Sequence, residues 1–260
     1  MQFVKPLTEK EYVECFKYFS ERSHEYEDML ELFTMVIDNL NKRSIEILSI
    51  GAGTGVFEEQ IIKISNVKIN ITCLEPNINH IPMLEKRNFI VIPEYLSVET
   101  KIDKKFDLVL MSHCLYPIKK PIEMIIKSME FLNSTGKLII FHQSSIGMYQ
   151  FISKIWPLIN FIDQPIADHS LSIEQIVMDL KNRPSFNYRL THGYVSSWID
   201  VKDIIQNNID ITHHLLTFFS QTNTKNLDSE IFNKMIQKIK SNIYDEYKYL
   251  HPTGILIIQN

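Results

Sequence analysis

The chain has 260 residues, of which 45% are hydrophobic and 22% are charged, a composition typical of a globular protein rather than a disordered one. Its 27 basic and 31 acidic residues give a formal net charge of −4, and no segment is strongly basic, which argues against a nucleic-acid partner. The three cysteines, Cys15, Cys73 and Cys114, form no CxxC pair or Cys/His cluster, so we expect free thiols and no metal site.

Segments for export or membrane insertion are not evident in the sequence. Residues 1–7 lack the basic start and the apolar core of a secretory signal. No apolar run approaches the ~20 residues that a membrane span needs. We therefore expect a cytoplasmic protein without a membrane partner.

Residues 1–42 carry the spacing of helices. Tyr12, Phe16 and Phe19 share one helical face, and Met29 and Phe33 continue the apolar spacing further along the chain. Glu, Lys and Ser residues occupy the other faces. The pattern predicts a helical hairpin that packs against the rest of the protein.

From residue 45 onward, short apolar strands alternate with helices. This order is typical of a parallel sheet with helices on both faces. The expected strands cover residues 45–50, 70–75, 89–92, 106–112 and 136–142. The expected helices cover residues 56–64, a short stretch after Pro76, and residues 121–132.

The last third of the chain is less regular. The expected elements are helices over 172–182, 211–220 and 228–248, a strand within 186–198, and a strong apolar strand over 254–258. A terminal strand that follows a long helix can insert antiparallel into the sheet. Together the elements predict an α/β, Rossmann-like fold with a seven-stranded, mostly parallel sheet and an antiparallel terminal strand.

Three of the seven glycines, Gly51, Gly53 and Gly55, lie where the first expected strand ends and a helix begins. Glycine there allows a sharp turn and a close backbone approach to a ligand, and the helix start offers free N–H groups. A dinucleotide-binding loop has the spacing GxGxxG, but Val56 occupies its third glycine position, and the Gly-Lys-Ser/Thr of a P-loop is absent. The spacing GxGxG favours the loop of an S-adenosylmethionine-dependent methyltransferase.

Polar residues after the following strands complete the predicted cofactor site. Glu75 ends the second strand, where a carboxylate can accept hydrogen bonds from two ribose hydroxyls. Ser97 follows the third strand and is a candidate for contact with adenine. Ser112 and His113 end the fourth strand and are candidates for the methionine part, because ligands of open α/β sheets bind at the carboxyl ends of strands.

Over nearly its full length the chain resembles the histamine N-methyltransferase family. The resemblance is carried by YVECFKYFSERSHEYEDMLELF at residues 12–33, IEILSIGAGTG at 45–55, CLEP at 73–76, FDLVLMSHCLYPIKKP at 106–121 and the terminal ILII strand. The glycine loop alone indicates a methyltransferase. The N-terminal segment is more specific, because most methyltransferases lack it.

The resemblance implies a role for each matching position. The implied cofactor contacts are Gly51, Glu75, His80, Ser97 and Ser112. Tyr12 falls in an N-terminal lid over the ligands, and Glu25 falls on the carboxylate that holds an amine substrate. Phe218 falls near an aromatic pocket wall, to which the family likeness also assigns Tyr149, Phe151 and Phe161.

Two histidines depart from the family's pattern. His113 and His251 fall where the family has two substrate-binding amides, Gln and Asn, and the family's tryptophans after the fifth strand are not matched. A histidine with a pKa of about 6.5 can take up the proton that methyl transfer releases, so both are candidate catalytic as well as substrate-binding residues. Since protonated imidazoles also bind acids, these changes leave the substrate open.

Each of these residues also has a structural interpretation. Glu25 lies in a charged stretch and fits an exposed helix acid, His113 fits a core histidine, and His251 fits an ordinary loop residue. His213 and His214 are interpreted as structural, because adjacent helix positions point to different faces.

The sequence therefore predicts an S-adenosylmethionine-dependent methyltransferase that acts on a nitrogen of a small amine or imidazole-like substrate and releases S-adenosylhomocysteine. Two alternatives stay open: a methyltransferase for another small acceptor, such as an amino-acid derivative, a carboxylate or a hydroxyl, and a non-catalytic cofactor-binding partner protein. We expect a monomer with one domain, 1–260: a helical lid at 1–42, a cofactor-binding core at 43–145, and substrate-side helices and last strands, with small substrate-binding insertions, at 146–260.

Overall fold

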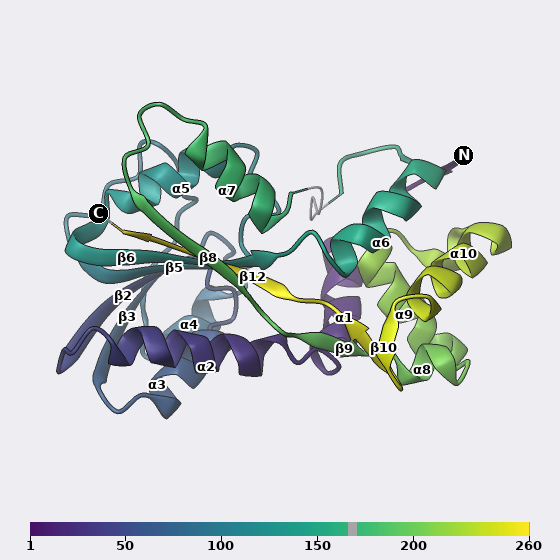
Figure 1. The fold of residues 1–260 in the computed structure, drawn as a ribbon, viewed down its shortest axis with the longest axis horizontal. Helices are drawn as coiled ribbons and strands as arrows, with labels where there is room; N and C mark the ends of the chain where they lie inside the picture. Colours follow the sequence, from purple (N-terminus) through teal and green to yellow (C-terminus); the bar gives the residue numbers. More distant parts are fainter. Residues whose placement is uncertain (166–170, 260) are drawn as a thin grey trace. The chain divides into compact units, whose positions relative to one another are not determined.

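The computed structural model describes residues 1–165 and 171–259 (Figure 1). Within this part the chain forms two compact units, each made of three segments. We call unit 1 the one formed by Met1–Glu25, Gln143–Ser172 and Ser196–Thr253. Unit 2 consists of Tyr26–His142, Ile173–Val195 and Gly254–Asn260. The single-domain organisation expected from the sequence stays a prediction.

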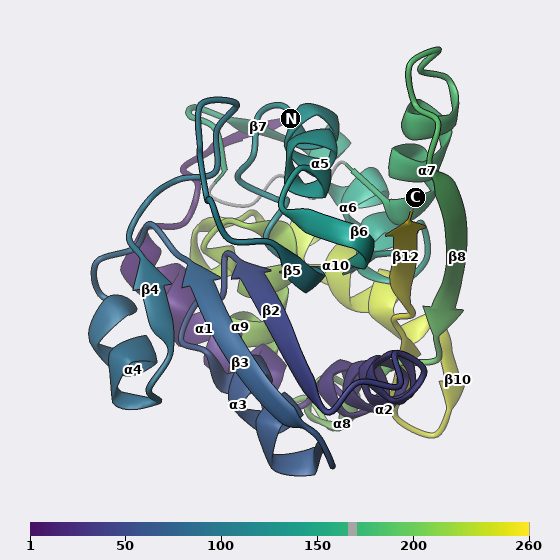
Figure 2. The same cartoon turned by 90° about the vertical axis from the view of Figure 1, so that its left-hand side faces the viewer.

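A seven-stranded sheet forms the centre of unit 2. Of its residues, only Gln143 and Thr253 are counted in unit 1. Its strand order is β4 (Ile90–Ile92), β3 (Lys68–Leu74), β2 (Ser44–Ile50), β5 (Phe106–Ser112), β6 (Leu132–Gln143), β12 (Thr253–Gln259) and β8 (Arg189–Val195). The first five strands pair in parallel. β12 is the antiparallel strand, and its arrow runs against that of β8 beside it (Figure 2). The predicted fold class is confirmed.

Helices cover both faces of this sheet. They are α2 (Glu25–Asp38), α3 (Val56–Ile64), α4 (Ile81–Lys86), α5 (Pro121–Met129) and α7 (Ile173–Lys181). α2 and α3 lie on one face, and α5 and α7 lie on the other (Figure 1). Phe33, Phe57 and Phe141, from two helices and a strand, meet in the core with ring centroids 6.0 to 6.4 Å apart. The apolar faces predicted from helical spacing and from the continuous strand FDLVLM are thus buried together.

Unit 1 is mostly helical and has its own apolar core. Its helices are α1 (Glu9–Ser20), α6 (Met148–Ile155), η1 (Trp156–Leu158), α8 (Lys202–Ile205), α9 (Ile209–Ser220), η2 (Thr224–Asn226) and α10 (Ser229–Lys240). Two small sheets join them: β1 (Gln2–Val4) with β7 (Ile159–Phe161), and β10 (Ile243–Asp245) with β11 (Lys248–Leu250) and β9 (Trp198–Asp200). Cys15, Phe19, Phe218 and Phe219 are among the buried residues of this core.

Two sequence-based expectations about secondary structure are wrong. The helix expected over 228–248 ends at Lys240, and a hairpin of β10 and β11 follows, with Glu246 at a φ of 38° in its turn. The charges at Asp245 and Lys248 match helical spacing, but they pair across the hairpin at 3.0 Å. Residues 2–4, expected to be helical, form β1, because Pro6 disfavours a helix upstream and a capping box at Thr8 begins α1 at Glu9.

None of the helices in the described parts of the chain has both the length and the apolar character that a bilayer crossing requires.

Candidate functional site

The glycine loop of unit 2 connects β2 to α3. Gly51, Gly53 and Gly55 have φ values of 67°, 57° and 75°, in the left-handed region that side chains disfavour. Gly55 is the residue before α3, and it caps the helix without a side chain. The loop therefore requires glycine at each of these positions for backbone reasons, before any ligand is considered.

The surroundings of the three glycines differ. A Cβ atom at Gly51 would lie 2.5 Å from the Cβ of Cys114, and one at Gly55 would lie 2.6 Å from Leu84. A Cβ at Gly53 would meet no atom within 4 Å. Gly51 and Gly55 are thus packed against the protein, whereas Gly53 borders open space. This is the part of the loop that a ligand can approach.

Glu75 follows β3 and is 5% exposed. Its Oε2 accepts a hydrogen bond from the N–H of Gly53 at 2.8 Å, and its Oε1 accepts one from the N–H of Asn77 at 2.9 Å. The Nδ1 atom of His80 lies 3.4 Å from the same Oε1. The structure therefore brings together three predicted cofactor residues, Gly53, Glu75 and His80. Each carboxylate oxygen has a second lone pair with which it can accept a ribose hydroxyl.

The other predicted cofactor residues lie further along unit 2. Ser97, in the loop after β4, accepts a hydrogen bond from the N–H of Glu99 at 3.2 Å, and its own N–H donates to the hydroxyl of Thr100 at 2.9 Å. Ser112 is the last residue of β5 and is half-buried. Its place at the carboxyl end of a central parallel strand is the one predicted for it.

His113 follows β5 with a φ of 50°, an uncommon value for a residue with a side chain. Such strain is found preferentially at functional positions. Its Nδ1 lies 3.0 Å from the hydroxyl of Tyr116, whose ring lies 4.5 Å from that of His142. The next residue, Cys114, packs under Gly51, and burial raises the pKa of its thiol to about 12, so it stays protonated. His113 thus lies in unit 2 next to Cys114, the residue that packs against Gly51 of the glycine loop.

The sequence reasoning missed a buried acid behind the glycine loop. Glu58 on α3 is 2% exposed, and its Oε1 accepts a hydrogen bond from Ser49 of β2 at 2.6 Å. Burial raises the pKa of this carboxyl group to about 7. The signal that could have found it is its spacing, because Glu58 precedes the buried Ile61 by three residues and so shares its helix face.

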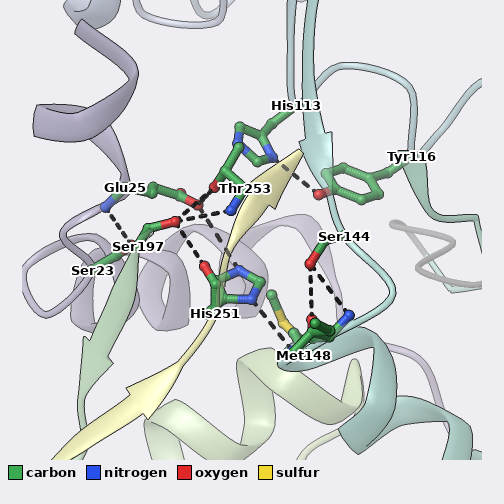
Figure 3. A network of polar contacts seen from close by, with 10 residues as sticks. Ser23, Glu25, His113, Tyr116, Ser144, Met148, Ser197, His251 and Thr253 are labelled. Carbon is green, nitrogen blue, oxygen red and sulfur yellow. Dashed lines mark hydrogen bonds and ion pairs between the residues drawn. The ribbon is translucent and has the colours of Figure 1, made fainter. Parts of the chain in front are cut away.

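The predicted substrate carboxylate, Glu25, is 4% exposed in unit 1, so it is not the solvated helix acid of the alternative interpretation. The residues before it pair with β9: the N–H of His24 donates to the carbonyl of Trp198 at 3.0 Å, and the two rings stack at 3.6 Å. The hydroxyl of Thr253 donates to Glu25 Oε2 at 3.3 Å (Figure 3). Backbone pairing and a side-chain contact thus fix this carboxylate.

His251 lies against the same carboxylate. It is 2% exposed, and its Nε2 is 3.9 Å from Glu25 Oε2. Its Nδ1 accepts a hydrogen bond from the N–H of Met148, the first residue of α6, at 3.3 Å (Figure 3). Since a backbone N–H can only donate, Nδ1 carries no proton here, and the proton of the neutral ring is on Nε2, which faces Glu25.

Aromatic rings complete this group, which we call the Glu25 cluster: Tyr12, Phe19, Glu25, Phe218 and His251. The rings of Tyr12 and Phe218 lie 5.5 Å apart, those of Phe218 and Phe19 4.6 Å apart, and those of Phe19 and His251 6.2 Å apart. Burial and the negative charge of Glu25 raise the pKa of Tyr12 to about 12. Four of the five predicted substrate residues therefore meet within unit 1, and the fifth, His113, belongs to unit 2.

The remaining aromatic candidates lie elsewhere in unit 1. Phe151 is fully buried against Phe219. Phe161, the last residue of the strand β7, contacts the ring of Trp156 edge-on. Tyr149 is half-buried on α6. His213 contacts Thr224 at 2.8 Å, as suits the structural role expected for it.

Comparison with known proteins gives the family. Residues 18–153, just over half of the chain, match the family described as methyltransferase domain. The chain belongs to this family. The methyltransferase class expected from the sequence is confirmed, and the expected cofactor, S-adenosylmethionine, is the methyl donor that the family uses.

One curated relative is carnosine N-methyltransferase 2 from Gallus gallus. It is 30% identical over 164 residues, which cover 53% of this chain and 51% of the relative. The chain thus spans about half the length of the curated relative that it matches.

Solved structures share the fold at low sequence identity. The plantazolicin methyltransferase BamL, in complex with a triazolic desmethylPZN analog and SAH, has a TM-score of 0.56 at 16% identity, covering 94% of this chain and 89% of its own. Coclaurine N-methyltransferase bound to N-methylheliamine and SAH has a TM-score of 0.53 at 11% identity, covering 90% and 70%. The [4+2]-cyclase SpnF has a TM-score of 0.51 at 13% identity, covering 88% and 80%. Because a cyclase shares the architecture, the fold alone does not define the reaction.

Proposed function

We propose that this protein transfers a methyl group from S-adenosylmethionine to a nitrogen of a small amine or imidazole-like acceptor. The observation that carries the proposal is the Glu25 cluster, in which a buried carboxylate faces the N–H side of a neutral histidine among aromatic rings. Family membership supports the methyl-transfer reaction, and the cluster supports the choice of acceptor.

The loop region of unit 2 fits the cofactor. Gly53 leaves open space at the loop, and Glu75 presents a carboxylate beside it, where the two hydroxyls of a ribose would bind. His80, Ser97 and Ser112 are the further residues we assign to the cofactor. When bound, S-adenosylmethionine supplies the methyl group as the electrophile of an in-line displacement.

The charge of the Glu25 cluster favours a cationic or N–H-bearing acceptor. His251 accepts the Met148 N–H at Nδ1, so protonating this ring would set two N–H groups against each other. In this arrangement the ring is neutral, and the negative charge of the cluster is that of the Glu25 carboxylate. An ammonium group or an imidazole N–H complements such a group, whereas a carboxylate acceptor would be repelled.

This geometry also bears on the acidic-acceptor alternative, which needs a protonated imidazole at position 251. The Met148 N–H opposes that state. We therefore assign His251 to orienting the acceptor and Glu25, and the catalytic role expected of His113, whose Nδ1 lies beside the Tyr116 hydroxyl, stays a prediction. In this scheme the burial of Glu25 keeps water from the carboxylate, which strengthens its attraction for a cation.

The names of two similar proteins agree with nitrogen as the methylated atom. One is carnosine N-methyltransferase 2, and the other is a coclaurine N-methyltransferase bound to N-methylheliamine. The likeness to the histamine N-methyltransferase family, a monomeric state and a cytoplasmic location stay predictions.

The proposal is tested by incubating the protein with S-adenosylmethionine labelled in its methyl group and a panel of small acceptors. Histamine represents an imidazole-bearing amine, carnosine represents one that also carries a carboxylate, and imidazole-4-acetate represents an acidic analogue without an amine. We expect turnover of at least one amine and at least tenfold less of the acid. Turnover of the acid alone would contradict the proposed acceptor class, and binding of S-adenosylmethionine without turnover of any small acceptor would favour the non-catalytic alternative.

A matched pair of variants tests the role of Glu25. Glu25→Gln removes the charge but keeps the shape, so kcat/KM for the amine should fall at least a hundredfold while the Kd for S-adenosylmethionine stays unchanged. Glu31→Gln changes an exposed acid on the same helix, α2, and should leave both quantities unaltered. Equal activity of the two variants would refute the assignment.

A further inference from the structure

Two hydroxyl groups connect the residues of the Glu25 cluster to one another. Ser197 and Thr253 are both fully buried in unit 1. Neither is a candidate from the sequence, and nothing in their local pattern marks them, because Ser197 and Thr253 are 56 residues apart in the chain. Ser197 directly precedes β9, and Thr253 is the first residue of β12; their side chains lie side by side in Figure 3.

The hydroxyl of Ser197 holds the short segment that carries His251. It donates to the carbonyl oxygen of His251 at 2.8 Å and accepts the N–H of Thr253 at 2.9 Å. The N–H of His251 in turn donates to the carbonyl oxygen of Ser197 at 3.0 Å. These three bonds enclose Pro252, which has no N–H of its own, so they fix the backbone on both sides of the proline.

The hydroxyl of Thr253 connects this segment to the carboxylate. It lies 3.1 Å from the Ser197 hydroxyl oxygen and donates to Glu25 Oε2 at 3.3 Å. The same Oε2 atom faces His251 Nε2. One carboxylate oxygen thus accepts the Thr253 hydroxyl and faces an imidazole nitrogen 3.9 Å away, and the hydrogen bond from Thr253 restricts the rotation of the Glu25 side chain.

We propose that Thr253, held by Ser197, is a positioning residue that fixes the carboxylate of Glu25 for recognition of the amine acceptor. This inference rests on the proposed function of Glu25. Thr253 acts through Glu25 and does not itself touch the acceptor. Its loss should therefore weaken recognition of the acceptor without changing the methyl donor or the overall fold.

Two variants separate the hydroxyl from the packing. Thr253→Val keeps the volume of the buried side chain and removes the hydroxyl, whereas Thr253→Ser keeps the hydroxyl and removes a methyl group. With histamine and carnosine as probes, we expect Thr253→Val to raise KM about tenfold with kcat within about twofold, because a hydrogen bond to a charged group is lost. Thr253→Ser should stay within about twofold of the wild type in both constants. Thr34→Val, which removes a hydroxyl from α2, serves as the control for hydroxyl loss elsewhere.

A second measurement does not depend on the acceptor. Crystal structures of the wild type and of Thr253→Val, each with S-adenosylhomocysteine, should show Glu25 in one conformer in the former and in several in the latter. If the wild type turns over neither probe, the proposed function fails, and the crystal comparison alone decides whether Thr253 positions Glu25. A single, unchanged Glu25 conformer in Thr253→Val, or equal KM values for the Val and Ser variants, would overturn the inference.

Discussion

The glycine-loop region of unit 2 and the Glu25 cluster of unit 1 hold their carboxylates by different means. Glu75 accepts two backbone N–H groups, from Gly53 and Asn77, that lie near it in the chain. Glu25 faces the side chains of Thr253 and His251, which lie more than two hundred residues away. The first carboxylate is fixed by backbone shape and the second by side chains. Changes to the backbone should therefore disrupt the position of the first carboxylate, whereas single side-chain changes should alter the position of the second.

The largest effect is expected where the loop backbone is packed most tightly. Gly51→Ala should destabilise the protein by about 4 kcal/mol, because the new Cβ would meet Cys114 and the residue would keep a left-handed conformation. Gly53→Ala has open space and should cost only about 1 kcal/mol. Urea unfolding measures both. Equal losses of stability would show that packing against Cys114 does not distinguish these glycines.

The next effect concerns the buried acid behind the loop. The pKa of Glu58 is raised to about 7 in the folded protein from an ordinary value of 4.5, so the folded state binds its proton more tightly than the unfolded state does. Stability from this group is therefore fully present below pH 4.5 and is lost as the pH rises through 7. A difference of this size corresponds to about 3 kcal/mol.

Glu58→Gln should remove this pH dependence, because a neutral amide can still accept the Ser49 hydroxyl. Urea unfolding between pH 5 and pH 8 should then show a smaller loss of stability in the variant than in the wild type. The exposed Glu85→Gln is the control, with the wild-type profile expected. Parallel profiles for all three proteins would contradict the buried-acid assignment.

The smallest effect is expected at the start of α1, which carries Tyr12 of the Glu25 cluster. Thr8→Ala removes a capping box and should cost about 1 kcal/mol, whereas Thr8→Ser should retain most of the stability. The N–H and hydroxyl of Thr8 lower the pKa of Glu11, so their contribution is present above 4.5 and is lost as the pH falls through the lowered pKa. Thermal unfolding at pH 7 and at pH 3 checks both statements. No difference between the Ala and Ser variants would contradict the cap.

The regions differ equally in how far the sequence predicted them. The strand at 106–112 and the helix at 56–64 have the predicted bounds, because their apolar patterns are continuous and their ends carry clear signals. Gly53, Glu75 and His80 also meet as predicted, since a strand–loop–helix unit sets their distances locally. The helix expected over 228–248 ends at Lys240. The charges of Asp245 and Lys248 match helical spacing, but they pair within a hairpin.

The Glu25 cluster could be predicted only in part. Family resemblance supplied Tyr12, Glu25, Phe218 and His251, but it could not supply the hydrogen bond that the Nδ1 of His251 accepts from the N–H of Met148. Ser197 and Thr253 carried no signal, because a buried serine or threonine looks the same in sequence whether or not it reaches a carboxylate. Contacts between distant segments are set by tertiary packing, which a local pattern does not record.

The most direct test of the account is calorimetric titration of S-adenosylmethionine into the wild type, Glu75→Gln and Glu25→Gln. We expect one-to-one binding by the wild type and an unchanged Kd for Glu25→Gln. Glu75→Gln should bind about a hundredfold more weakly, because an amide offers one acceptor where two backbone N–H groups and the ribose require several. No binding by the wild type, or equal losses in the two variants, would contradict the assignment of the cofactor to the glycine-loop region and of the acceptor to Glu25.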